Sequence, residues 1–112
     1  MISNEAFRQM ALSFPGAIEL PHFDRASFRA NKKIFATLLE KDQLAMLKLP
    51  LVEQSVFCAV DKTVIYPVPG GWGRNGATYV ELKKVKKAML KDAMTVAFND
   101  LTPKPRVVKR EK

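Results

Sequence analysis

Pro69-Gly70-Gly71-Trp72-Gly73-Arg74-Asn75-Gly76-Ala77-Thr78-Tyr79-Val80-Glu81-Leu82 is the most informative stretch of this 112-residue sequence. It places the only Trp among four glycines, which permit positive φ angles, and then continues into a β-rich run. A phosphate-binding loop would end in Gly-Lys-Ser/Thr and lead into a helix, so this class of site is not predicted. Trp72 has two interpretations: it packs against the core and holds the loop, or it is an exposed platform on which a base stacks.

Working outward, the remaining sequence alternates between helical and extended patterns. An N-cap at Ser3 and a stop at Pro15-Gly16 predict a helix over residues 3–13. Short runs separated by polar turns predict antiparallel strands at residues 17–20 (limited by Pro21), 26–30, 33–39, 44–49, 62–66 and 78–82. The other helices are expected at residues 51–60 and 85–101, the former with Val52, Val56, Phe57 and Val60 inward and Glu53 and Gln54 outward.

This order of elements predicts an α+β fold with a single antiparallel sheet and helices packed on one face. The length suits one domain, which we place at residues 1–103. Residues 104–112 hold five cationic residues and one acidic residue, a net charge of +4 out of +8, and we expect them to form a basic, disordered tail.

Composition indicates the class of protein and its expected cellular location. At 47% hydrophobic and 27% charged, the chain has a globular profile, and no apolar run is long enough for a membrane span. The single cysteine, Cys58, excludes an internal disulfide framework, and the first residues lack the pattern of a signal peptide. We therefore expect a cytoplasmic protein without membrane attachment. A monomer is expected, although pairing of edge strands between chains is left open.

Several short segments, in this order and spacing, resemble the MmcQ/YjbR family of small, mostly bacterial proteins. They are Phe14-Pro15-Gly16, Pro21-His22-Phe23, Phe28-Arg29, Lys33-Ile34-Phe35-Ala36-Thr37-Leu38, Leu47-Lys48-Leu49, Gly71-Trp72-Gly73 and Leu101-Thr102-Pro103-Lys104. The resemblance covers about residues 3–105. It implies a CyaY-like (frataxin-like) α+β fold and a DNA-binding role with a "double wing" arrangement. The glycine-rich segment around Trp72 is longer than in the plainest members.

The residue types give little support to catalysis or metal binding. The chain has one His and one Cys, far too few for a zinc site with four such ligands. His22 is interpreted either as a half-buried residue bonded to the backbone or as a general base or ligand contact. Cys58 is interpreted as a buried thiol and not a reactive one. The first helix has one acid, Glu5, so an iron site of the frataxin type is not carried over with the fold. We predict no enzyme, no cofactor and no metal.

Cationic side chains are the remaining signal, and they suggest nucleic acid as the partner. We predict phosphate contacts from Arg25, Arg29, Lys32, Lys33 and Arg74, added positive field from Lys83, Lys84 and Lys87, and stacking on Trp72. The binding is expected to be weak and largely independent of sequence. The alternative is a protein-interaction or small-ligand module in which the loop from Pro67 to Gly76 and His22 line a pocket and the lysines are merely solvated.

Overall fold

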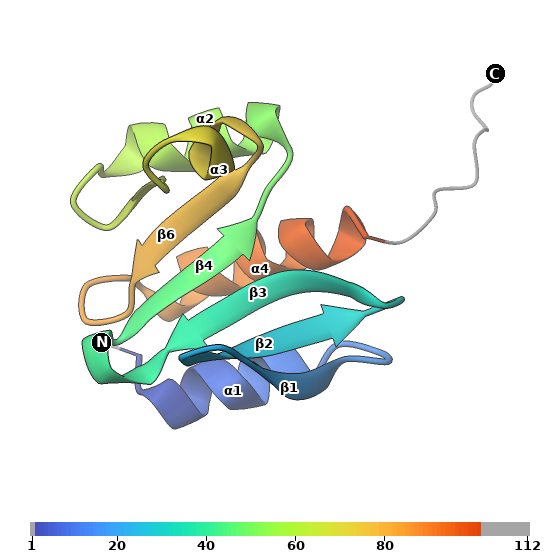
Figure 1. Cartoon of the computed structure of the whole chain (residues 1–112). Coiled ribbons are helices and arrows are strands. Elements are labelled where there is room, and N and C mark those ends of the chain that lie inside the picture. The colour runs from blue at the N-terminus through green and yellow to red at the C-terminus, as the bar shows by residue number, and fades with distance from the viewer. Residues whose placement is uncertain (1, 102–112) are drawn as a thin grey trace, which may run out of the picture.

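The computed structural model describes residues 2–101, which form a six-stranded antiparallel sheet with four α-helices (Figure 1). The order along the chain is α1 (Asn4–Leu12), β1 (Ile18–His22), β2 (Arg25–Ala30), β3 (Lys33–Leu39), the 3-10 turn η1 (Glu40–Asp42), β4 (Leu44–Lys48), α2 (Leu51–Val60), β5 (Ile65–Pro67), α3 (Gly71–Arg74), β6 (Ala77–Glu81) and α4 (Lys87–Asn99). The strands are arranged β1-β2-β3-β4-β6-β5. The predicted α+β class with one antiparallel sheet is confirmed. The predicted tail, residues 104–112, lies outside the described residues.

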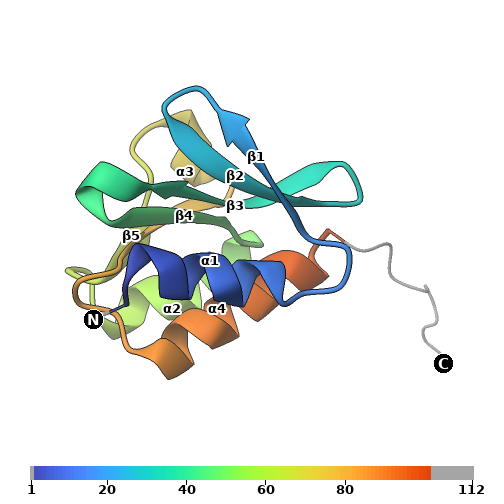
Figure 2. The same cartoon turned by 90° about the horizontal axis from the view of Figure 1, so that it is seen from below.

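The sheet has two different faces. Helices α1, α2 and α4 lie on one side of it, whereas the short α3 and the β1–β2 hairpin rise on the other side (Figure 2). Between the sheet and the three long helices lies a core that includes Phe7, Phe28 and Phe35, all fully buried. Phe14 follows α1 and closes the core, with its ring stacked 4.8 Å from that of Phe98 of α4. The opposite face is therefore the one left free for other molecules.

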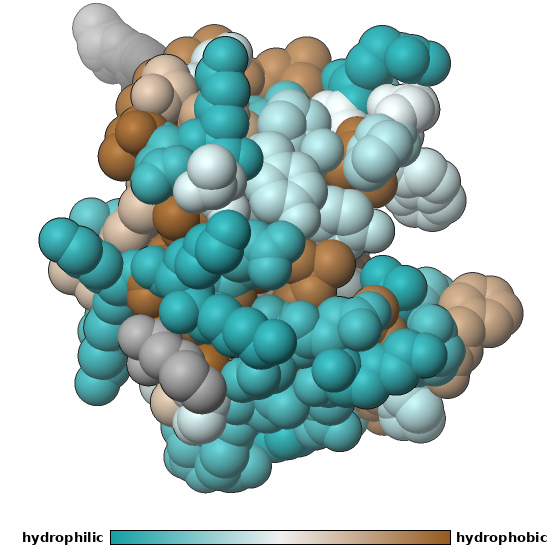
Figure 3. Space-filling model, turned by 90° about the vertical axis from the view of Figure 1, so that its left-hand side faces the viewer, coloured by the Kyte–Doolittle hydropathy of each residue, from teal (hydrophilic) through white to brown (hydrophobic). Residues whose placement is uncertain are grey.

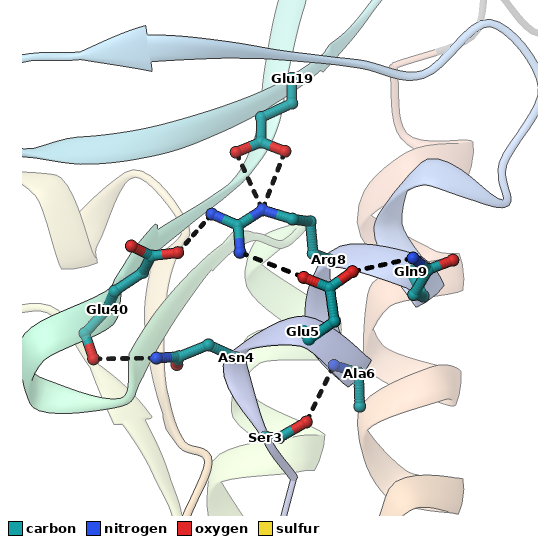
Figure 4. Close-up of polar contacts among 8 residues, drawn as sticks. All are labelled: Ser3, Asn4, Glu5, Ala6, Arg8, Gln9, Glu19 and Glu40. Atoms are coloured by element: carbon teal, nitrogen blue, oxygen red, sulfur yellow. Dashed lines mark hydrogen bonds and ion pairs between the residues drawn. The ribbon is translucent and has the colours of Figure 1, made fainter.

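Helix α1 begins as expected and is tied to the sheet by one cation. The Ser3 side chain accepts a hydrogen bond from the Ala6 N–H at 3.0 Å, which caps the helix. The Arg8 guanidinium forms ion pairs with three carboxylates: Glu5 on its own helix, Glu19 on β1 at 3.0 Å, and Glu40 on η1 (Figure 4). The hydrogen bond to Glu40 is the main cause that raises the pKa of Arg8. Arg8 thus joins α1 to two separate parts of the sheet.

Strand β1 does not stop before Pro21, as the sequence suggested, but continues to His22. Because β1 is an edge strand, a proline that lacks an N–H can be accommodated in it. The glycine-rich segment also differs from the expected open loop, since residues Gly71–Arg74 form one turn of helix, α3. Lys83 and Lys84, expected near the start of the last helix, lie in the turn between β6 and α4.

The predicted orientation of α2 is wrong for its valines and for Gln54, whereas Phe57 packs against the core as predicted. Its stripe of Val52, Val56 and Val60 faces outward, with exposed fractions of 74%, 57% and 69%, while Gln54 is buried. The Gln54 side chain donates hydrogen bonds to the carbonyl oxygens of Gly73 and Ala77, at 2.9 and 3.2 Å, and to Thr78 Oγ1. Buried polar groups need such partners, so the polar residue sets which face of the helix is turned inward.

Candidate nucleic-acid interface

A groove of about 560 Å³ crosses the sheet face that carries no long helix. Its floor is formed by Ile34 and Thr37 of β3, Met46 of β4 and Tyr79 of β6. In the side view of Figure 3 the outline is indented on the right, between an upper and a lower lobe, on this side of the sheet. Two projecting elements form the walls. The hairpin wing is residues 22–25, and the glycine wing is α3 with Val68.

The hairpin wing presents an exposed aromatic at its tip. His22 pairs with Arg25 in the β1–β2 register, which leaves Phe23 and Asp24 as the two turn residues. Phe23 has φ +60° and is 95% exposed, and the His22 ring lies against it at 4.8 Å. Asp24 Oδ1 accepts a hydrogen bond from Arg25 Nε at 3.1 Å, and this bond is the main cause that lowers the pKa of Asp24. The Asp24 carboxylate therefore balances the charge of the Arg25 guanidinium at the tip of the hairpin wing.

The glycine wing presents the second aromatic and is tightly built. Trp72 is 76% exposed, so the interpretation that it packs into the core is wrong. Beneath it, Gly73 lies so close to the backbone that an added Cβ would come within 1.9 Å of the Val68 carbonyl oxygen. The Gly73 carbonyl also accepts the hydrogen bond from buried Gln54. Glycine is thus needed at this position for close approach, and the wing holds Trp72 outward on a fixed support.

The predicted cationic residues divide between the groove and other places. Arg25 lines the groove, and Arg29 pairs with the floor residue Ile34 and donates from Nε to Ser27 Oγ at 3.1 Å. Arg74 is the last residue of α3, two positions after Trp72, and does not line the groove. Arg25 and Arg29 therefore lie at this face of the sheet, and Arg74 belongs to the wing that rises from it.

The predicted lysines are less concentrated. Lys32 and Lys33 lie at the β2–β3 turn, at the opposite end of β2 from the hairpin wing. Lys83, Lys84 and Lys87 follow the end of β6 that is away from α3, and Lys84 Nζ donates to the Thr63 carbonyl at 3.5 Å. The structure therefore does not bring these last three lysines to the groove.

Among the groove residues that sequence reasoning missed are an exposed aromatic, a cation and a tyrosine of the floor: Phe23, Lys48 and Tyr79. The alternation in β4, where Ala45 and Leu47 are fully buried and Lys48 is exposed, carries a signal that could have placed Lys48 on the free face. No comparable signal marks Phe23, because an apolar residue next to a strand is ordinarily expected to be buried.

A pair of tyrosines extends the same face toward the far edge of the sheet. Tyr66 of β5 lies opposite Tyr79, with ring centroids 5.9 Å apart. The Tyr66 hydroxyl donates a hydrogen bond to Glu81. Desolvation, together with this bond and the nearby carboxylate, raises the pKa of Tyr66 to about 12. At neutral pH the phenol is therefore a firmly protonated donor.

The residues considered for catalysis have ordinary structural settings. Cys58 is buried, and desolvation raises the pKa of its thiol, which disfavours the reactive thiolate. His22 is half-buried at the base of the hairpin wing. Within residues 2–101 there is no group of three or more His, Cys, Asp or Glu side chains that could hold a metal ion. No helix in that range is long and apolar enough to cross a membrane.

Comparison with known proteins supports the fold. The chain is similar to a solved structure of the Deinococcus radiodurans protein DR2400, described as a DUF419 domain, with a TM-score of 0.80. The alignment covers 96% of this chain and 84% of that one at 15% sequence identity. DUF419 is a YjbR/MmcQ-like family. No family model matches the chain, and no curated protein matches it. At this identity the similarity establishes a shared α+β architecture.

Proposed function

We propose that the protein binds nucleic acid on the helix-free face of its sheet, without catalysis, and that it is a relative of the YjbR/MmcQ-like proteins. The observation that carries the proposal is the groove between Phe23 and Trp72, two exposed aromatics on opposite walls, with Arg25 and Lys48 in the same lining. Exposed aromatics flanked by Arg and Lys are typical of surfaces that bind a charged backbone carrying flat bases. A cytoplasmic location and a monomeric state are part of the same proposal.

Phosphate contacts would come from both walls and from the floor. Arg25 and Lys48 line the groove, Arg29 lies beside it, and Arg74 belongs to the glycine wing. Each phosphate neutralised adds about 0.7 to the salt slope of binding for a single strand and about 0.9 for a duplex. Because Arg25 is already paired with Asp24, its contribution is expected to be smaller than that of Arg29 or Arg74.

The test is a salt series with labelled oligonucleotides between about 50 and 200 mM salt. We compare Arg29→Ala/Arg74→Ala with Lys83→Ala/Lys84→Ala, which removes the same charge from the turn after β6. The proposal expects the first variant to lower the slope by about 1–2 and the second to change it little. Equal effects of the two variants would mean that net charge alone is responsible. Binding that disappears in a chain ending at Pro103 would assign the activity to the terminal residues.

The alternative is a module that binds a protein segment or small ligand in the same groove. The apolar part of the floor, Ile34, Met46 and Tyr79, together with Val68 and His22 on the walls, favours it. Such binding would depend weakly on salt and would survive the Arg29→Ala/Arg74→Ala substitution. The same salt series therefore separates the two functions.

A further inference from the structure

We propose that the groove selects unpaired bases, with one base of a single strand stacked on Phe23 and another on Trp72. This inference rests on the nucleic-acid function proposed above and specifies the form of the ligand. It follows from two separate observations: Phe23 is exposed at a turn position that favours glycine, and Trp72 is exposed on a hydrogen-bonded turn. The phosphates between and beside the stacked bases are then contacted by the cations named above: Arg25, Arg29, Lys48 and Arg74.

Phe23 occupies a turn position that suits glycine better than an aromatic. A two-residue hairpin turn with positive φ at its first residue is most easily formed by Gly, and Phe at φ +60° is strained. The ring gains no burial in return, since the residue is 95% exposed. The fold therefore gives no reason for Phe at this site, whereas a flat ligand face would.

Trp72 is exposed, yet its backbone is held rigidly. The turn of α3 closes through hydrogen bonds from the Asn75 N–H to Gly71 O at 3.1 Å and from the Gly76 N–H to Gly73 O at 3.0 Å. The Leu49 N–H in turn donates to Gly76 O at 2.9 Å, which fixes the wing to the segment between β4 and α2. An aromatic on a fixed backbone loses less conformational freedom on binding than one on a mobile loop, which favours a stacking role.

The shape and chemistry of the groove favour single strands over duplexes. In a duplex the bases are stacked on each other and their faces are not available to protein rings, whereas an unpaired strand offers both faces. Ile34 and Met46 on the floor are apolar, so they suit the flat faces of bases better than they suit phosphates. A duplex could reach only the cations at the rims of the walls, without the two aromatic contacts.

The experiment uses the full chain and three probes of equal length: an oligo-dT strand, the same strand with abasic sites, and a duplex. Binding is followed by Trp72 fluorescence and by anisotropy of a label on the nucleic acid. Oligo-dT is expected to bind tightest and to quench Trp72, which is the only Trp in the chain. Loss of stacking in the abasic strand should weaken binding by roughly 5- to 150-fold per aromatic contact.

Phe23→Gly separates the ligand contact from stability. The substitution should raise the urea midpoint by relieving the turn, and at the same time weaken oligo-dT binding roughly 5- to 150-fold. Trp72→Leu should weaken it similarly. The control is Val52→Ala, which trims an exposed apolar side chain on α2, away from the groove, and should leave affinity unchanged.

The outcomes distinguish this inference from the function on which it rests. If the abasic strand or the duplex binds as well as oligo-dT, and Phe23→Gly has no effect, base stacking is refuted while phosphate binding stands. If none of the three probes binds, both proposals fail. If a proline-rich peptide binds through Phe23 and Trp72 and oligo-dT does not, the groove is a peptide site and both proposals are likewise overturned.

Discussion

Replacing Gly73 by Ala tests the support beneath Trp72. The added Cβ would lie 1.9 Å from the Val68 carbonyl oxygen and 3.0 Å from its carbon, far inside van der Waals contact. Backbone atoms cannot swing away as a side-chain end can, so α3 must move by roughly 1 Å or more. That movement would also stretch the 2.9 Å hydrogen bond from Gln54 to Gly73 O and leave the amide with its two longer bonds, to Ala77 O and Thr78 Oγ1.

The cost can be estimated from these two effects. Overpacking and loss of the buried hydrogen bond, less the helical preference of Ala, amount to about 2–5 kcal/mol of unfolding free energy. The matched control is Gly71→Ala in the same turn, where the nearest atom to an added Cβ is the end of the Arg74 side chain at 3.7 Å. Gly71→Ala should be neutral or stabilising by up to about 1 kcal/mol.

Urea denaturation followed by circular dichroism gives the comparison directly. Gly73→Ala should lower the midpoint by about 1 M or more relative to Gly71→Ala, given an ordinary urea dependence. The anisotropy of Trp72 should fall in the Gly73 variant, because its support is loosened. Equal midpoints for the two variants would refute the argument that close approach requires glycine. A functional consequence follows as well, since oligo-dT affinity should fall in Gly73→Ala but not in Gly71→Ala.

Three further predictions concern the protonation and packing of single residues. Tyr66 holds its proton to about pH 12 when folded, against an ordinary value of 10.0, so stability should fall as the pH rises from about 10 to 12. A spectrophotometric titration should lose its latest tyrosinate transition in Tyr66→Phe. Cys58 should react slowly with a disulfide reagent in the native protein and quickly in urea; fast native reaction would contradict its burial. Arg8→Met should lower the unfolding free energy by about 1–2 kcal/mol by leaving its carboxylate partners unpaired, and an unchanged urea midpoint would show that the cluster is not stabilising.

The sequence predicts the sheet well because its strands are short, alternating and separated by polar turns. Residues 33–39 and 51–60 agree with β3 and α2 at both ends. What the pattern could not supply is the orientation of α2, because its valines repeat at helical spacing whichever way the helix faces. Gln54 determines the orientation of α2, because its hydrogen-bond acceptors lie more than 18 residues further along the chain.

The candidate site was predictable only in part, for a related reason. Arg25 and Trp72 line the groove, as a basic, stacking surface requires. The second wall is the β1–β2 hairpin, whereas the predicted contacts Lys32 and Lys33 lie in the β2–β3 turn. Which hairpin bends over the free face depends on the curvature of the whole sheet. That curvature arises from strand twist and from the bulge at Phe28/Arg29, which local patterns do not reveal.

The Arg8 cluster has a practical consequence for anyone who varies ionic strength. The bond between Arg8 and Glu19 fastens β1 to α1, and β1 leads directly into Phe23. Glu40 and Glu5 are exposed enough for added ions to compete with their share of the cluster. Concentrated salt would then weaken the proposed nucleic-acid binding in two ways, by shielding phosphates and by loosening the strand that holds Phe23. Hydrogen exchange of the β1 amides, recorded along the same titration without ligand, reads the second effect alone.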